Sequence, residues 1–156
     1  MIKLTRIDDR LVHGQVAMTW TPALGADCLI VANDKVAKDE FMKMTLGLAK
    51  PASAKLLIKS MADTVTFLND PRSQPLKILI LVNSVQDAAT LAAQVSEIKS
   101  VNFGGIRTKE GTRSIAKAIA VTEDDIAIIK ELLAKGIELE VRQVPTDKKT
   151  MIDTLI

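Results

Sequence analysis

The side chains best suited to chemistry lie in one short segment, residues 6–16, which reads RIDDRLVHGQV. It contains His13, the only histidine of the chain, three residues after Arg10. A neutral imidazole is a nucleophile at physiological pH, and a guanidinium can bind two phosphoryl oxygens at once. Gly14 lets a ligand approach the backbone closely, and a helix beginning after it would offer unpaired N–H groups to an anion. This combination predicts a site for phosphoryl transfer, with His13 and Arg10 as its catalytic residues.

The polar neighbours of His13 are assigned supporting roles. Asp8 or Asp9 could hold the imidazole in one tautomer or pair with an arginine, and we assign the orienting role to Asp9. Gly14, Gln15 and Arg6 are assigned to phosphate binding. A pair of aspartates is equally typical of a solvated turn or a helix cap, and Gln15 is also compatible with an exposed helix face.

Short apolar runs alternate with amphipathic segments along the chain. Strands are expected at 2–8, 27–33, 55–59, 76–83, 98–103 and 137–144, with a further one near 115–121. Unbroken apolar runs of this kind fit strands that are covered on both faces, as in parallel sheets. Between them, helices are expected from 34 to about 48 and after Ser60, Ser84 and Thr122, each of which forms a capping box with an aspartate three residues later. Residues 146–156 could form a short terminal helix.

This alternation predicts a single α/β domain spanning residues 1–156. Its sheet would be open and mostly parallel, with about six to seven strands and helices on both faces. In such sheets ligands bind beyond the carboxyl ends of the strands. Six residues that end or follow predicted strands are therefore expected at one rim: Asp8, Asn33, Asn83, Asn102, Gly104 and Gly105. Asparagine and paired glycines are also common in ordinary turns and caps.

Composition excludes several classes of function. Aromatic residues make up 3% of the chain and Tyr is absent, so base stacking on an aromatic platform, and with it nucleic-acid binding, is not expected. A lone Cys28 and a lone His13 cannot build a Cys/His zinc site, and Cys28 lies in an apolar run typical of a buried strand. No Walker A motif or dinucleotide fingerprint is present, so no cofactor is expected.

The distribution of apolar and charged residues indicates where the chain is located and which partners it could bind. No apolar run approaches the roughly 20 residues that span a bilayer, and the first ten residues are charged without a signal-peptide core, so we expect a cytoplasmic chain. Beginning at Met1, it is expected to act as a stand-alone subunit. The net charge of +2 is mild. One basic stretch is either a solvated face or a docking surface for an acidic partner, and it comprises Arg107, Lys109, Arg113 and Lys117.

The segment RIDDRLVHGQV resembles the active-site loop of the mannose/fructose/sorbose family of phosphotransferase-system (PTS) IIB domains. The resemblance continues, in order, through AND at 32–34, KP at 50–51, VNFGG at 101–105, KEGT at 109–112, TEDD at 122–125 and VPTD at 144–147. It implies an α/β phosphotransferase that accepts a phosphoryl group on Nδ1 of His13 from a IIA protein or domain. Arg10 would stabilise the transferring group, and the acceptor would be a sugar imported by the membrane components IIC and IID. The chain itself would associate peripherally with that complex, and the sugar is not readable from it.

Two other functions remain compatible with the same residues. A signalling module similar to a response-regulator receiver would use Asp8 and Asp9 as an acidic pocket, but it also needs a phospho-accepting aspartate after its third strand. Here the run at 55–59 is followed by Ser60. A small-anion-binding module would use the same rim without turnover. Only the phosphoryl carrier requires His13 to be accessible to two partners in turn, each docking transiently.

Overall fold

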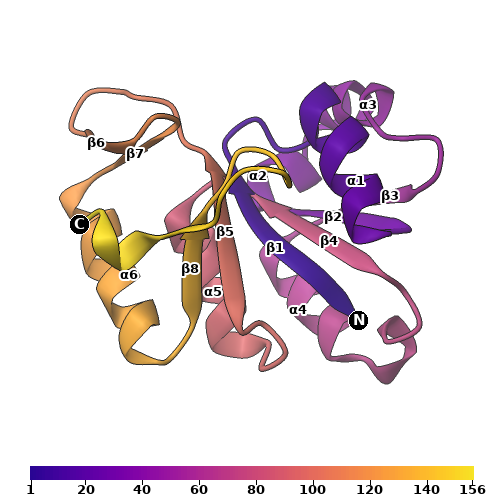
Figure 1. Ribbon diagram of the computed structural model, residues 1–156. Coiled ribbons are helices and arrows are strands. Elements are labelled where there is room, and N and C mark those ends of the chain that lie inside the picture. Colours follow the sequence, from indigo (N-terminus) through magenta and orange to yellow (C-terminus); the bar gives the residue numbers. More distant parts are fainter.

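The computed structural model in Figure 1 describes residues 1–156. Seven strands form one sheet in the order β3-β2-β4-β1-β5-β8-β9. All neighbours pair in parallel except β8 and β9, which are antiparallel. The strands are β1 (Ile2–Asp8), β2 (Cys28–Ala32), β3 (Lys55–Lys59), β4 (Ile78–Val82), β5 (Ser100–Gly105), β8 (Glu138–Val141) and β9 (Thr150–Met151). The predicted α/β class with a mostly parallel sheet is therefore confirmed.

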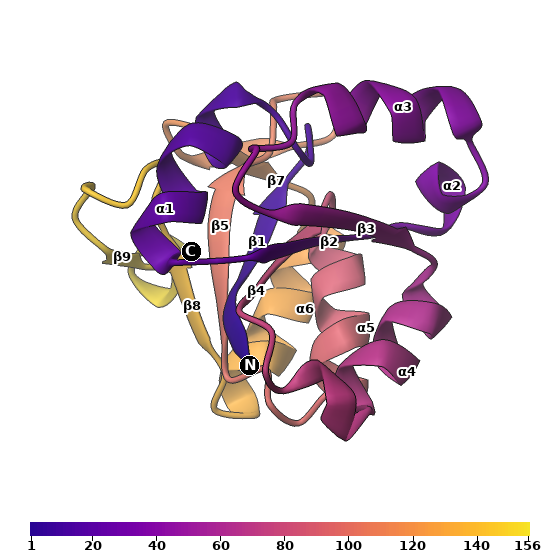
Figure 2. The ribbon, with the colours of Figure 1, turned by 90° about the vertical axis from the view of Figure 1, so that its right-hand side faces the viewer.

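Helices cover both faces of this sheet. They are α1 (Thr21–Leu24), α2 (Asp34–Ala37), α3 (Glu40–Leu48), α4 (Met61–Asn69), α5 (Val85–Gln94) and α6 (Glu123–Ala134). Figure 2 shows α4, α5 and α6 together on one side of β2 and β3, with α3 on the other. No helix of the chain is long and apolar enough to cross a bilayer.

Strand alternation divides the buried side chains into two cores. In β2, Ile30 points into the larger core beneath α4, α5 and α6, whereas Leu29 and Val31 point into the smaller one. The smaller core contains Trp20 and is covered by the segment that follows β1 together with α2 and α3. Because both faces of the central strands are buried, their apolar runs are continuous rather than alternating.

The expected helix starts are present, with one refinement. Ser60 and Ser84 each accept a hydrogen bond from the backbone N–H three residues later. Only Thr122 forms the full reciprocal box, since Asp125 also accepts from the Thr122 N–H at 3.0 Å. The cap that each hydroxyl provides thus fixes where these three helices begin.

Three expected elements differ from the structure. The segment 34–48 is two helices, because the Asp39 carboxylate caps α3 by accepting from the Met42 N–H at 3.0 Å. The segment near 115–121 lies outside the main sheet, in a hairpin of β6 (Arg113–Ala116) and β7 (Ile119–Val121). The terminal helix at 146–156 is wrong: β9 pairs with the edge of β8, and a single 3-10 turn, Ile152–Thr154, follows it. A helix this short is marginal in water, so pairing with the open strand edge prevails.

Candidate active site

The candidate site begins where the central strand β1 ends. Arg6 and Asp8, its last charged residues, are buried almost completely. The chain then turns sharply: Leu11 has a φ of 58°, in the left-handed region that non-glycine residues rarely adopt. The Leu11 N–H donates to the Asp8 carbonyl at 2.9 Å, which closes the turn. Local backbone strain of this kind persists only where surrounding contacts hold it, and it clusters at functional sites.

The turn brings the imidazole of His13 onto the carboxylate of Asp8. Nε2 of His13 lies 2.8 Å from Oδ2 of Asp8. An ionised carboxylate can only accept, so Nε2 carries the proton and Nδ1 carries the lone pair. Nδ1 has no hydrogen-bond partner in the protein, and the side chain is 15% exposed. The arrangement therefore leaves the nucleophilic nitrogen unoccupied in a partly open position.

Further donors for an anion lie on the same loop as His13. The Arg10 side chain is 51% exposed, with its Nε 3.8 Å from Oδ1 of Asp8. The helical segment that follows His13 begins with the Ala17 N–H donating to the His13 carbonyl at 3.0 Å, and it continues through a π-helical turn, Val16–Trp20, into α1. The N–H groups of Gly14 and Gln15 have no acceptor within the protein. A guanidinium, two unpaired amides and a helix start together can bind phosphoryl oxygens.

A polar cleft of about 430 Å³ adjoins this loop. Arg10 lines one part of it, and Arg107 and Lys117 from the β5–β7 region line another. Asp9 also lines the cleft, where its carboxylate accepts from Nε of Arg107 at 3.1 Å and from the Arg107 N–H at 2.9 Å. The predicted orienting role of Asp9 is therefore corrected: Asp9 holds Arg107, and Asp8 holds His13.

Arg6 also departs from its predicted role. Its side chain is 1% exposed, so it does not reach a phosphoryl group bound at the surface. Its guanidinium instead donates to Oδ2 of Asp8 at 3.3 Å and to Oδ1 of Asn102 at 2.7 Å. Burial lowers the pKa of Arg6 from its ordinary value, and the neighbouring Asp8 carboxylate opposes this by raising it. Arg6 is thus a buried partner of Asp8 rather than a phosphate ligand.

The predicted rim residues separate into different environments. Asn33 caps α2 by accepting from the Val36 N–H at 2.8 Å, which is the ordinary structural role. Asn83 lines a second polar cavity of about 580 Å³ together with Asp9 and Arg107. Asn102 is fully buried beside Arg6.

The two glycines of the rim stay close to the β1 end. The Gly105 carbonyl accepts from the Asp9 N–H at 2.9 Å, and Gly104 lies against the Arg6 guanidinium. Of the predicted rim, Asp8, Gly104 and Gly105 are therefore grouped at the end of β1, whereas Asn33 belongs to a helix start.

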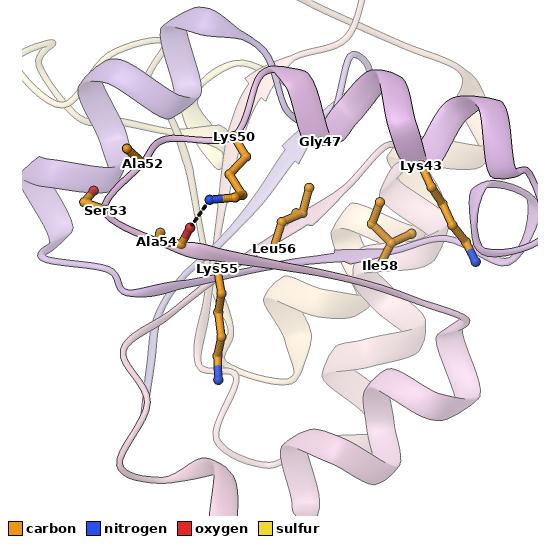
Figure 3. A pocket seen from close by; sticks show the side chains of 9 residues that line it. All are labelled: Lys43, Gly47, Lys50, Ala52, Ser53, Ala54, Lys55, Leu56 and Ile58. Carbon is orange, nitrogen blue, oxygen red and sulfur yellow. Dashed lines mark hydrogen bonds between the residues drawn. The ribbon is translucent and has the colours of Figure 1, made fainter.

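Two further features of the sequence lie away from this chemistry. Cys28 is buried in β2 as expected, and burial raises the pKa of its thiol. A cavity of about 790 Å³ lies between α3 and the edge strand β3. Figure 3 shows that the side chains of Lys43, Lys50 and Lys55 do not converge there, and that Nζ of Lys50 is bound to the Ala54 carbonyl, at 2.9 Å. That cavity therefore offers no cluster of donors for an anion.

Sequence reasoning missed several residues of the site. Trp20 donates to the Gln143 carbonyl at 2.9 Å, with its ring centroid 5.0 Å from Cζ of Arg6 and 5.2 Å from Cζ of Arg142. Glu140, on β8, accepts from Asn102 at 3.0 Å. Charged residues alternate with apolar ones in this strand, a pattern typical of one exposed face, so no signal in the sequence indicates that Glu140 is buried. The sequence carries no sign of which residues it would meet.

Comparisons with known proteins show the family and match the fold. The family described as PTS system sorbose subfamily IIB component matches residues 2–156. A probable phosphotransferase enzyme IIB component of Streptococcus pyogenes is 38% identical, covering 100% of this chain and 99% of that protein. The mannose-specific EIIAB component of Escherichia coli is 37% identical over all of this chain, which spans 48% of that longer protein. The crystal structure of the IIB domain of the sorbose permease from Klebsiella pneumoniae superposes with a TM-score of 0.92 at 32% identity, covering 97% of this chain and 93% of that one.

Proposed function

Because the chain belongs to the sorbose subfamily of PTS IIB components, we propose that it carries a phosphoryl group on Nδ1 of His13. The donor is a phosphohistidine of a IIA protein or domain, and the acceptor is a sugar imported through the membrane components IIC and IID. The IIB components of this family are phosphotransferases. The observation that supports the proposal best is the contact of 2.8 Å between Nε2 of His13 and Asp8, because it leaves the lone pair on Nδ1.

The first step follows from that tautomer. The Nδ1 lone pair attacks phosphorus, a new N–P bond forms, and the N–P bond of the donor breaks with its electron pair returning to the donor imidazole. The phosphorylated His13 ring, which still carries its proton on Nε2, is cationic, and the Asp8 carboxylate lies against that proton. Arg10 and the amides of Gly14 and Gln15 stabilise the phosphoryl oxygens as charge shifts among them.

In the second step, the imidazole of His13 is the leaving group. A hydroxyl oxygen of the sugar attacks phosphorus and loses its proton to a base, and the N–P bond breaks with its electrons returning to Nδ1. His13 is then neutral again, with the same tautomer. Both partners need the same nitrogen in turn, so each complex has to be transient, and the partial exposure of the ring is compatible with this.

The setting is proposed from the family as well. The chain acts on the cytoplasmic side, docked peripherally on the membrane complex. The similar proteins are named for different sugars, mannose in one case and sorbose in another, so no single sugar is proposed. The basic residues Arg107 and Lys117 line the polar cleft beside Arg10, where an acidic partner surface could approach.

A phosphorylation assay tests the proposal. The purified chain is incubated with phosphoenolpyruvate, the general PTS proteins and a matching IIA protein, and the label is mapped by intact and peptide mass. We expect one acid-labile phosphoryl group on His13. The variant His13→Ala should take up no label, and Arg10→Ala should still bind the donor but accept the group at least about tenfold more slowly.

Arg72→Ala is the matched control, because Arg72 is also an exposed arginine but pairs with Asp70, remote in sequence from the loop. It should be labelled at the wild-type rate. A label on Asp8 or Asp9 would instead support a receiver-like module. Binding of inorganic phosphate or a sugar phosphate without any covalent label would support an anion-binding module.

A further inference from the structure

We propose that Arg6 is a positioning residue for His13, acting through Asp8, and that Gly104 and Glu140 hold Arg6 in place. Arg6 itself touches neither the phosphoryl group nor the imidazole. The consequence for phosphoryl transfer depends on the proposed function, whereas the effect on the imidazole does not. The structure supports the assignment through contacts, charge and space.

The first support is the sharing of one carboxylate oxygen. Oδ2 of Asp8 accepts from NH2 of Arg6 at 3.3 Å and lies 2.8 Å from Nε2 of His13. Oδ1 accepts from the Arg10 N–H at 3.1 Å. Both oxygens of a carboxylate that is 1% exposed are therefore committed, and the rotation of the group is fixed by donors on two sides. The imidazole is consequently held by an acceptor that cannot turn away.

The second support is that Arg6 is itself held by partners from three other segments. Besides Asp8, its guanidinium donates to Asn102 on β5 at 2.7 Å and to the carbonyls of Arg142 and Gln143 at 3.0 Å each. Trp20 packs against it on the segment after His13. The side chain is thus fixed in one place at the end of β1 and has no freedom to follow a ligand.

The third support is charge balance in the buried cluster. Glu140 accepts from Nε and NH2 of Arg142 at 3.0 Å each and from Asn102 at 3.0 Å, and is nearly buried. Two guanidiniums, Arg6 and Arg142, therefore face two carboxylates, Asp8 and Glu140. A buried charge without a partner is expensive. Without Arg6, Oδ2 of Asp8 would lose its buried donor, and the carboxylate would be free to turn or to admit water, so it would no longer be a fixed acceptor for Nε2–H.

The fourth support is the space left by a glycine. A Cβ built on Gly104 would overlap the guanidinium carbon and both terminal nitrogens of Arg6. The backbone of Gly104 does not have a positive φ, so alanine is compatible with its conformation, and the three atoms nearest to the added Cβ all belong to Arg6. Gly104→Ala therefore displaces the Arg6 guanidinium without removing its charge.

The charged groups around His13 are few enough to allow a clean test. Asp8 contacts the ring, the exposed Arg10 lies beside the far oxygen of Asp8, and Arg6 and then Glu140 lie behind Asp8. The Asp9–Arg107 pair lines the neighbouring cleft. His13 is the only histidine, so its ring nitrogens can be observed by NMR without ambiguity.

The experiment measures the imidazole by ¹⁵N NMR in the full chain without any phosphoryl donor. In the wild type we expect a single tautomer with a resolved, slowly exchanging Nε2–H. In Arg6→Met and Gly104→Ala we expect a mixture of tautomers and a proton signal broadened by exchange with water. Arg6→Lys keeps the charge but not the fork of donors, so it should restore part of the wild-type signature. Gly47→Ala is the matched control, because a Cβ there meets nothing within 4 Å.

A second measurement follows the reaction with a phosphorylated IIA donor. The maximal transfer rate of Gly104→Ala should fall about 100-fold, as expected for a misplaced reacting group, with the KM for the donor changed by less than about twofold. If Arg6→Met does not fold, Gly104→Ala and Glu140→Gln decide the question. A wild-type tautomer and Nε2–H signal in folded Gly104→Ala and Glu140→Gln would overturn the assignment. Absence of phosphorylation in every variant, the wild type included, would reject the proposed function. The positioning role of Arg6 would then be tested by the NMR measurement alone.

Discussion

Two arginine–aspartate pairs in this chain have the same spacing in sequence and opposite surroundings. Arg6 and Asp8 lie two residues apart at the end of β1, and Asp70 and Arg72 lie two residues apart after α4. The Arg72–Asp70 pair is shorter, at 2.6 Å against 3.3 Å, yet its side chains are 90% and 31% exposed against 1% for both members of the buried pair. Hydrogen bonds from Arg72 lower the pKa of Asp70 to about 2, whereas burial lowers the pKa of Arg6 itself.

The effect of an ion pair on stability depends on its surroundings more than on the distance between its charges. In water, the attraction of the exposed pair is screened and offset by the ordering of two flexible side chains. In the interior, the cost of removing both charges from water offsets their attraction, so the pair adds little to the stability of the folded state. Removing one partner is strongly destabilising, because it leaves the other charge buried without a partner. A buried pair that contributes little to stability but fixes a neighbouring imidazole is better explained by function than by folding.

The largest expected effect comes from leaving the buried arginine without its carboxylate. The variant Asp8→Asn keeps the shape of the side chain but leaves Arg6 unpaired, so we expect the free energy of unfolding to fall by about 3–5 kcal/mol. Urea denaturation followed by circular dichroism measures the change. A loss below about 1 kcal/mol would place this pair in the same energetic class as exposed ones.

A smaller effect is expected from the aromatic ring that packs against two guanidiniums. Trp20→Phe removes the hydrogen bond of 2.9 Å to the Gln143 carbonyl and part of the surface facing Arg6 and Arg142. We expect a loss of about 1–2 kcal/mol, measured by thermal unfolding. Unchanged stability would show that the buried cluster is held by its ion pairs alone.

A partly exposed carboxylate at the amino end of β1 is intermediate between the buried Arg6–Asp8 pair and the exposed Asp70–Arg72 pair. The Ile2 N–H donates to Glu97 at 2.7 Å and the Gln74 amide donates to its other oxygen at 3.0 Å. These bonds hold the pKa of Glu97 below its ordinary value. A carboxylate whose pKa is lower when folded contributes stability above its unfolded pKa, and that contribution is lost as the pH falls through the folded value.

Glu97→Gln should therefore cost about 0.5–1 kcal/mol at pH 7. The difference from the wild type should shrink as the pH is lowered below the ordinary pKa of a glutamate and through the lower pKa of folded Glu97. Urea midpoints measured across that range check the sign. A difference that grows on acidification would contradict the assignment.

The smallest effect is expected at the exposed pair. Arg72→Ala should leave the urea midpoint within experimental error of the wild type, although it removes the shorter of the two ion pairs. High salt should change the wild type and this variant alike. A destabilisation as large as that of Asp8→Asn would show that burial does not explain the difference between the two pairs.

Sequence reasoning recovered the parts of the molecule that local patterns specify. The apolar runs of β2 and β4 and the caps at Ser60, Ser84 and Thr122 depend on neighbours within a few residues. Residue type and spacing also pointed to His13 and Arg10 as candidates, and the structure places both side chains beside Asp8. The terminal segment was misjudged because its conformation depends on pairing with β8, which no local pattern shows.

The choice between Asp8 and Asp9 shows where such reasoning stops. Successive residues at the end of a strand face opposite sides, and the pairing of β1 with β5 shifts register between Ile7 and Asp8. Which carboxylate meets His13 therefore depends on an irregularity in the sheet. Arg6 was misassigned for a related reason: its partners Asn102 and Arg142 are 96 and 136 residues away in sequence.

The proposed role of His13 predicts which of its ring nitrogens becomes phosphorylated. The chain, labelled with ¹⁵N in its one histidine and phosphorylated through a IIA donor, can be examined by ³¹P and ¹⁵N NMR to find which ring nitrogen is bonded to phosphorus. We expect phosphorus on Nδ1, with the proton retained on Nε2 against Asp8. Phosphorus on Nε2, or on any residue other than His13, would contradict the account.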